Sequence, residues 1–279
     1  MNSKIVADSC CDLPKQMQED MNVDLIPFKI MVEDVTYIDD DSLNPIDLLK
    51  AIKSTPSVPK SSCPSPDDFY NCFKNSMSNN IFIITISSFL SGSYNSALTA
   101  KNIFLETNKD KFIHIFDSLS AASGEVLVAL KINECIEKNL PNNELVSTVT
   151  GFIEGMKTFF ILDSLDNLIK NGRISKLKGF LASILNIVPI MKAVKGEIDM
   201  HEKSRGSKKA FNRLVEIIGE HGSDFKDKIL SISHCNAKEK AEWLKEAVLK
   251  VYNFKDIIIL ETKGLSTMYA YDGGVIIAF

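Results

Sequence analysis

Residues 81–97 read IFIITISSFLSGSYNSA, an apolar run that gives way to serines and then to a helix-like stretch. The same order occurs at residues 4–13, KIVADSCCDL, and at residues 112–124, FIHIFDSLSAASG. Apolar strands that alternate with helices predict a parallel sheet whose strands share one carboxyl edge. Open α/β sheets bind ligands at that edge, where hydroxyls and helix N-terminal N–H groups suit an anion. The pattern therefore predicts a site for a small acidic group.

Helix capping is the alternative explanation of each turn. Ser and Asp after a strand are ordinary N-caps, because their oxygens accept the free N–H groups of the first helical turn. However, three turns stand at equivalent places, and one turn carries Ser87, Ser88, Ser91 and Ser93. That is more hydroxyls than capping needs, which favours a binding site.

Length and composition indicate one large or two medium globular domains, with 279 residues, 45% hydrophobic and 24% charged. A net charge of −4 and the lack of any Lys/Arg block argue against a nucleic-acid-binding protein. No signal-peptide pattern is visible at the start. The longest apolar stretch, residues 179–194, contains Asn186, Pro189 and Lys192 and is too short to span a bilayer. We expect a cytoplasmic protein without stable membrane insertion.

Cysteine and arginine usage bear on the site chemistry. The six cysteines have no metal-ligand spacing and no C-x-x-C pair, so we expect free thiols and no metal or other cofactor. A reactive thiol at Cys10 or Cys63 is the minor alternative. Only Arg173, Arg205 and Arg213 are arginines among 32 basic residues. A chain that prefers Lys so strongly is expected to keep Arg where a planar, permanently charged group is needed.

The two halves of the chain have different patterns. The first half alternates strands with helices, which predicts a parallel sheet with flanking helices. The second half predicts a β-hairpin over residues 187–200 with a turn at Lys195-Gly196. Later strands are expected near residues 229–233, 257–261 and 265–271, in a mixed or antiparallel sheet with helices. We therefore expect an α/β fold of two domains, residues 1–156 and 157–279, with a binding site in the cleft between them.

Five segments have a joint spacing that is similar to that of a known family. They are DSCCDL (8–13), SSCPSP (61–66), SSFLSGSYNSA (87–97), DSLSAASG (117–124) and LDNLIKNGRI (165–174). The match continues through LNIVPI (185–190) and RGSKKA (205–210) to His234. The chain resembles the DegV family over essentially its whole length.

This resemblance implies a two-domain protein that buries one long-chain fatty acid, such as palmitate or oleate, in an apolar tunnel. It places the carboxylate on the hydroxyl-rich loops, at Ser61, Ser62, Ser91, Gly92 and Ser93. Arg173 and Arg205 would lie at the basic tunnel mouth. Some members present the carboxylate to a separate fatty acid kinase, so the resemblance implies a binding subunit that is not itself the catalyst.

The C-terminal segment departs from the family pattern. Tyr269 stands where the family has a His beside the carboxylate; its phenol keeps a hydrogen bond but offers no cation. Tyr271 replaces a Gly, and Asp272 follows it, so both are expected to crowd the mouth. Cys63 replaces a Gln. We expect fatty-acid binding to survive these changes and the transfer to a kinase to be weakened.

Three other functions remain open from the residues alone. A serine hydrolase would pair a serine with His234, yet no G-x-S-x-G elbow is present and a loop or capping histidine is favoured. A nucleotide-binding module lacks its glycine motifs. A sensor or carrier of another small organic acid stays an alternative, because the apolar segment 180–185 fits a tunnel wall and an ordinary core equally well.

Overall fold

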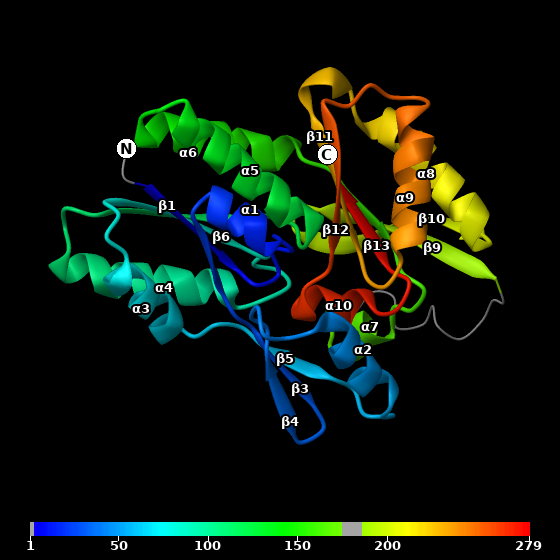
Figure 1. The fold of residues 1–279 in the computed structure, drawn as a ribbon, viewed down its shortest axis with the longest axis horizontal. Coiled ribbons are helices and arrows are strands. Elements are labelled where there is room, and N and C mark those ends of the chain that lie inside the picture. The colour runs from blue at the N-terminus through cyan, green and yellow to red at the C-terminus, as the bar shows by residue number, and fades with distance from the viewer. Residues whose placement is uncertain (1–2, 175–185) are drawn as a thin grey trace.

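The computed structural model describes residues 3–174 and 186–279, which form three β-sheets covered by helices (Figure 1). Sheet A has the order β2-β1-β6-β7, and all of its strands are parallel. They are β1 (Ser3–Asp8), β2 (Val23–Ile26), β6 (Asn80–Thr85) and β7 (Phe112–Asp117).

Helices cover both faces of sheet A because its strands are apolar on both sides. On one face Ile5 and Phe82 pack against two helices, α5 (Ser123–Glu137) and α6 (Asn142–Gly155). On the other face Val6 and Ile83 pack against α3 (Pro66–Asn75) and α4 (Ser93–Thr107). Figure 1 shows these two helix pairs on opposite sides of the sheet, and the short helix α1 (Lys15–Asp20) follows β1.

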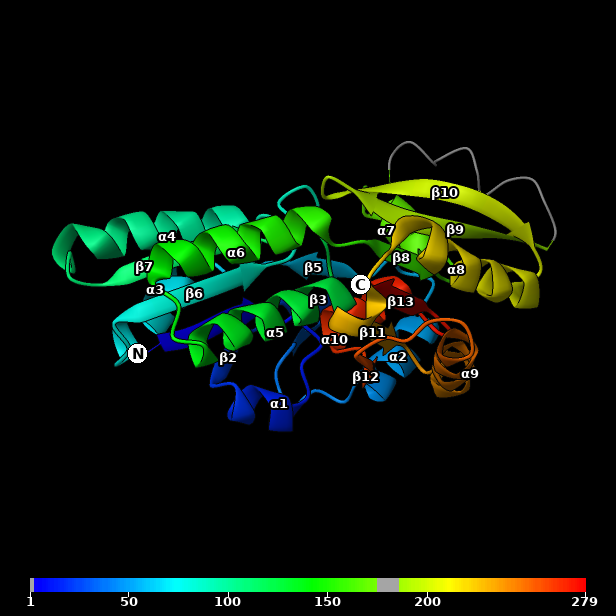
Figure 2. The same ribbon diagram turned by 90° about the horizontal axis from the view of Figure 1, so that it is seen from above.

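Sheet C is mixed, with the order β10-β9-β8-β13-β11-β12. Only β11 and β12 pair in parallel; the other neighbours are antiparallel. One face packs against α8 (Ser207–His221) and α9 (Lys238–Leu249) around Ile217, Leu244 and Ile277 (Figure 2). The strands are β8 (Thr158–Ile161), β9 (Ile187–Val194), β10 (Glu197–Arg205), β11 (Ile229–His234), β12 (Asp256–Glu261) and β13 (Val275–Ala278).

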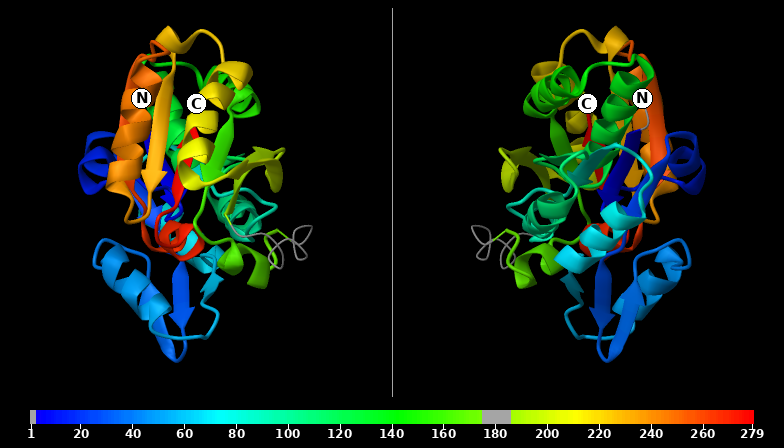
Figure 3. Two further views of the ribbon diagram at one scale, coloured as in Figure 1. Left: turned by 90° about the vertical axis from the view of Figure 1, so that its right-hand side faces the viewer. Right: turned by 90° about the vertical axis from the view of Figure 1, so that its left-hand side faces the viewer.

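A small third sheet projects from one end of the molecule (Figure 3). Sheet B pairs β4 (Val35–Ile38), β3 (Lys29–Val32) and β5 (Lys60–Ser62) in antiparallel order. Its core joins the helix α2 (Pro45–Lys53) and contains Ile30, Leu48 and Met268. Met268 belongs to α10 (Gly264–Ala270), so the C-terminal segment packs against the N-terminal half. The remaining short elements are α7 (Asp166–Lys170) and a 3-10 helix (Phe225–Asp227).

Most predicted elements are confirmed, including the parallel sheet and the hairpin at Lys195-Gly196. The strand expected over residues 265–271 is wrong: that segment is α10, and the strand is β13 further along. The apolar run misled the prediction because nearly every α10 side chain is buried, which removes the helical period. Residues 60–62, which follow Pro59, form β5, a short strand that ends before Pro64 and Pro66.

Two expectations are not decided by this architecture. The predicted boundary at 156/157 falls between α6 and β8, and the division into two domains stays a prediction. The apolar segment 180–185 lies outside the described residues. Within the described ranges, no helix combines the length and apolar character needed to cross a membrane.

Candidate functional site

The hydroxyl-rich turns do converge, and a carboxylate of the protein itself joins two of them. Asp8 ends β1 and is fully buried. Its Oδ2 accepts hydrogen bonds from the Ser93 hydroxyl at 2.6 Å and from the Ile86 N–H at 3.0 Å, while Oδ1 accepts from the Cys10 N–H at 3.2 Å. Part of the anion-binding potential that the sequence indicated is therefore used inside the fold.

A second buried carboxylate connects the turn after β1 to the start of α10. Asp39 accepts hydrogen bonds from the Ser9 hydroxyl at 2.7 Å and from the N–H groups of Gly264 at 2.7 Å and Leu265 at 2.9 Å. A negative group at a helix N-terminus is favoured by the free N–H groups there. Asp39 thus fixes α10 against the N-terminal half, beside the cavity described next.

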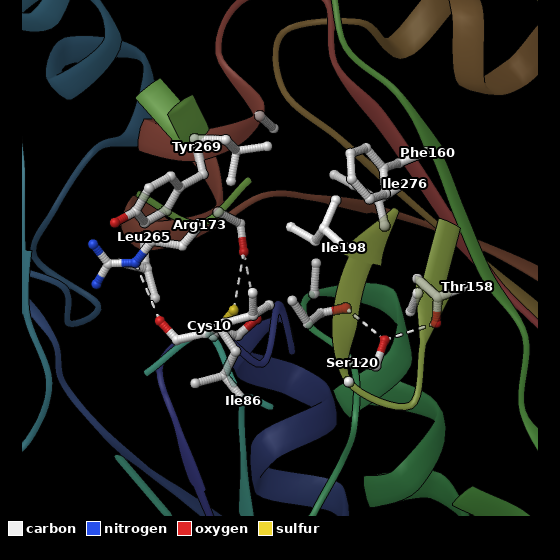
Figure 4. Close-up of a pocket in the computed structure, with 18 of the residues that line it drawn as sticks. Cys10, Ile86, Ser120, Thr158, Phe160, Arg173, Ile198, Leu265, Tyr269 and Ile276 are labelled. Atoms are coloured by element: carbon white, nitrogen blue, oxygen red, sulfur yellow. Dashed lines mark hydrogen bonds between the residues drawn. The ribbon is translucent and has the colours of Figure 1, made fainter. Parts of the chain in front are cut away.

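An apolar cavity lies between the turns of sheet A, the inner face of sheet C and α10 (Figure 4). The empty space among its lining atoms, including the part open to solvent, is about 740 Å³. The lining residues are Cys10, Ile86, Leu90, Leu119, Ser120, Ala121, Ala122, Thr158, Phe160, Leu162, Leu168, Arg173, Ala193, Gly196, Ile198, Leu265, Ser266, Tyr269, Ala270 and Ile276. Small-molecule sites have this apolar character with a few polar groups.

One end of the cavity carries Arg173 and Tyr269, which lie side by side in Figure 4. The Arg173 guanidinium carbon is 5.9 Å from the centre of the Tyr269 ring. Its Nε donates to the Leu90 carbonyl at 3.2 Å, which anchors the side chain. The Tyr269 hydroxyl is 3.1 Å from Ser61 Oγ. Arg173 is the one charged side chain among the described lining residues, so this end attracts an anion.

The rest of the cavity carries only neutral polar groups. Ser120 Oγ and Thr158 Oγ1 bond to each other at 2.7 Å away from the Arg173 end (Figure 4). Between the Arg173 end and the Ser120–Thr158 end, Cys10 Sγ lies 3.8 Å from Ser266 Oγ. Burial, reinforced by Glu125 and Asp8, raises the pKa of the Cys10 thiol, so it is held protonated. That environment argues against a reactive thiolate at Cys10.

Carboxyl groups behind the cavity wall are also held toward their neutral form. Burial raises the pKa of Asp8 to about 6, although its hydrogen bonds from Ser93 and Ile86 act in the opposite sense. Burial raises the pKa of Asp12 to about 7. Glu125 is fully buried beside Asp8, and burial raises its pKa well above its ordinary value. The wall therefore adds little negative charge to repel an anionic ligand at moderately acid pH.

Several predicted head-group residues lie outside the cavity lining. The Ser93 hydroxyl donates its hydrogen bond to Asp8, and Ser91 Oγ accepts a hydrogen bond from the Ser93 N–H at 3.2 Å. Gly92 precedes α4, and Ser62 is exposed at the end of β5. The structure thus places Tyr269 and Arg173 at one end of the cavity. Ser61 bonds to the Tyr269 hydroxyl but, like the other predicted loop residues, does not line the cavity.

Arg205 and His234 are placed differently from Arg173. Arg205 is exposed at the end of β10 and does not line the cavity. His234 is buried at the end of β11, where its Nδ1 accepts the Ala237 N–H at 3.4 Å just before α9. This contact ties His234 to the loop before α9, but no side chain caps the first turn of that helix. Their predicted roles at a tunnel mouth or near a ligand stay predictions.

Two altered residues after Tyr269, Tyr271 and Asp272, lie outside the cavity lining. Tyr271 has φ +55°, a left-handed conformation that suits the Gly of the family pattern. Asp272 forms an ion pair with Lys53 and accepts from Asn236 at 2.7 Å. Lys53 holds the pKa of Asp272 below its usual value. Neither Tyr271 nor Asp272 lines the cavity, so the expected crowding of its mouth finds no support in this arrangement.

Some lining residues were missed by the sequence analysis. Ser266 lay in the segment taken for a strand, and Thr158 begins a strand with no distinguishing motif. Gly196 offered a signal, because it occupies the hairpin turn with φ +87°. A Cβ there would lie 2.6 Å from Ser87 Oγ, and the Ser87 hydroxyl donates to the Gly196 carbonyl at 2.7 Å. The hairpin can therefore close over the turn after β6.

Comparison with known proteins identifies the family. The family model described as "Uncharacterised protein, DegV family" matches residues 2–279. The chain belongs to the DegV family. A curated DegV domain-containing protein of Streptococcus pneumoniae is 36% identical over 282 residues, which cover 100% of this chain and 99% of the relative.

Solved structures of the DegV family are also similar. A DegV family protein of Ruminococcus gnavus, solved with vaccenic acid, aligns with a TM-score of 0.96, 38% identity and 100% coverage of both chains. The Streptococcus pneumoniae fatty acid kinase (Fak) B3 protein, loaded with linoleic acid, has a TM-score of 0.91 and 36% identity, covering 100% of this chain and 99% of that one. A DegV family protein of Eubacterium eligens, loaded with heptadecanoic acid, has a TM-score of 0.90 and 26% identity, with 99% and 98% coverage.

Proposed function

We propose that this protein binds one long-chain fatty acid in the cavity, with the carboxylate at the Arg173 end. The observation that carries the proposal is an apolar cavity whose one charged lining residue, among those described, is a cation. An acyl chain gains about 0.8 kcal/mol for each CH₂ that leaves water, before ordering costs. Relatives solved with vaccenic, linoleic and heptadecanoic acid support this class of ligand.

The proposed orientation follows from charge. A carboxylate prefers the planar guanidinium of Arg173, whose N–H donors match its two oxygens. The Tyr269 hydroxyl lies at the same end and would donate to the carboxylate, with Ser61 bonded to it from outside the lining. The other polar pair, Ser120 and Thr158, is neutral and satisfied internally. In this proposal Ser93, Ser91 and Gly92 support the loop from behind rather than touch the ligand.

The two predicted domains contribute different parts of this proposed site. Leu90 and Leu119 come from residues 1–156, and Phe160, Ile198 and Ile276 come from residues 157–279. The β9–β10 hairpin and β13 would therefore close the tunnel over the turns of sheet A. Opening would require the two parts to separate or the hairpin to move.

We further infer that the protein presents its fatty acid to a separate kinase and is not itself the catalyst. The similarity to a protein named for fatty acid kinase supports this inference. The serine-hydrolase alternative is disfavoured, because His234 is buried against the Ala237 N–H and lies outside the cavity lining.

The experiment that tests the function narrows the cavity from its hairpin wall. Ala193 lines the cavity, whereas its neighbour Val194 is 41% exposed and does not. We expect Ala193→Phe to block binding of oleate to delipidated protein in calorimetry. The matched control Val194→Phe should bind as the wild type does. Equal oleate affinity in the two folded variants would contradict the proposal.

A further inference from the structure

The face of sheet C that is opposite the cavity carries a cluster of metal-binding side chains. His201 lies on β10, while Glu220 and His221 form the end of α8, which packs against the β9–β10 hairpin (Figures 1 and 3). One donor atom from each of the three lies within 4.8 Å of the others. Among the described residues, this is the one group of three or more His, Cys, Asp or Glu side chains with such spacing.

We propose that His201, Glu220 and His221 form a binding site for a divalent transition-metal ion, with Zn²⁺ as its probe. Two imidazole nitrogens and one carboxylate oxygen are a common donor set for Zn²⁺, and they leave a fourth position open. Ligand atoms around a tetrahedral Zn²⁺ lie about 3.3 Å apart. The observed donor atoms lie within 4.8 Å of one another, so metal binding would draw the three side chains closer together.

The ring of Phe159 packs against both imidazoles and fixes their positions. Its centroid distances are 5.3 Å to His201 and 5.2 Å to His221, while the two imidazoles are 5.1 Å apart. Burial, and then the positive charge of Lys192, holds the pKa of His201 below its ordinary value. No hydrogen bond to either imidazole is made within the described ranges.

The surrounding charges permit a cation at this place. Lys192 and Arg213 both place positive charge near His201, and Arg213 is engaged by three carboxylates, Glu202, Glu216 and Glu220. It donates to Glu220 Oε1 at 2.6 Å and to Oε2 at 2.8 Å. Each carboxylate oxygen has a second lone pair, so Glu220 is able to keep Arg213 and still ligate a metal. The negative end of the α8 dipole adds a favourable term.

A bound ion would join the hairpin, which forms one cavity wall, to α8. Ile198 lines the cavity three residues before His201 on the same strand. Metal binding should therefore raise the melting temperature of the whole protein, because it stabilises only the folded arrangement.

The test adds Zn²⁺ alone to metal-free, full-length protein in calorimetry, with Co²⁺ spectroscopy to report the ligands. We expect one saturable site whose affinity falls at least about tenfold in His201→Gln and in His221→Gln. His114→Gln is the matched control, because His114 lies in sheet A, and it should bind as the wild type does. Glu220→Gln, at an exposed position, should weaken binding without loss of fold. Unchanged affinity in the site variants, no saturable binding, or a thiolate-to-cobalt charge-transfer band would overturn the proposal.

Discussion

The Ser93 hydroxyl donates a hydrogen bond to Asp8 Oδ2 at 2.6 Å, and both side chains are fully buried. This contact joins the start of α4 to the end of β1, so the turns after the two central strands of sheet A are held as one unit. Both turns supply residues to the cavity wall, through Cys10, Ile86 and Leu90. The role of Ser93 is therefore to shape the wall.

The first prediction concerns this bond. Ser93→Ala leaves a buried carboxylate short of one donor, so the free energy of unfolding should fall on the order of 1.5–3 kcal/mol. Urea unfolding measures the change. Ser96→Ala, in the same helix, is the control and should leave stability nearly unchanged. A Ser93→Ala protein as stable as this control would show that the bond contributes little.

The second prediction concerns the charge at one end of the cavity. Arg173→Gln removes the proposed carboxylate partner, so the affinity for oleate should fall about 10- to 100-fold. Arg205→Gln makes the same chemical change at an exposed position outside the lining and should have little effect. Calorimetry on delipidated proteins compares them. A larger loss of oleate affinity in Arg205→Gln than in Arg173→Gln would indicate that Arg205 binds the carboxylate instead.

The third prediction concerns pH. Burial raises the pKa of Asp12 to about 7 and that of Glu125 well above its ordinary value, so the folded protein binds more protons than the unfolded chain. Stability is then present at low pH and is lost as pH rises through the folded pKa values. The window to examine is about pH 6.5 to 8, because the lowered pKa values of His114, His201 and His234 act in the opposite sense below it.

Urea midpoints across that window measure the effect. The midpoint should fall from pH 6.5 to 8 in the wild type, and the fall should be smaller in Glu125→Gln, which has one buried carboxyl fewer. A wild-type midpoint that rises, or an identical slope in the variant, would contradict the assignment of Glu125 as a buried neutral acid.

The fourth prediction concerns Tyr269, which stands where the family has His. Tyr269 offers a hydrogen bond, shared with Ser61, and no cation. Fatty-acid binding should therefore persist while acyl phosphate formation with a fatty acid kinase subunit is slow, and Tyr269→His should accelerate it. Reconstitution with the kinase decides between outcomes. Robust acyl phosphate formation by the wild type, with no gain in Tyr269→His, would show that the departure has no functional effect.

The sequence predicted the convergence of the hydroxyl-rich turns because parallel strands end at one edge. The sequence did not indicate that Asp8 would accept a hydrogen bond from Ser93, or Asp39 one from Ser9. An aspartate in such a segment is equally typical of an ordinary turn or helix cap. The partners of Asp39 are Ser9 and, more than 200 residues away, Gly264 and Leu265. Such long-range pairs leave no local pattern.

The cavity itself was only partly predictable. Arg173 stood out by the rarity of arginine, and it does line the cavity. Ile198 and Ile276 lie on strands whose apolar pattern is typical of an ordinary packed core. The segment that forms α10 was wrongly predicted to be a strand. A tunnel and a packed core have the same apolar period, so which one forms depends on how two sheets meet.

Mass spectrometry of lipid extracted from the purified protein decides whether a fatty acid occupies the cavity. We expect about one equivalent of long-chain fatty acid in the wild type, a much smaller amount in Ala193→Phe, and a rise in melting temperature when palmitate or oleate is added to delipidated protein. No acyl lipid in the extract, together with no shift in melting temperature with either acid, would contradict this expectation.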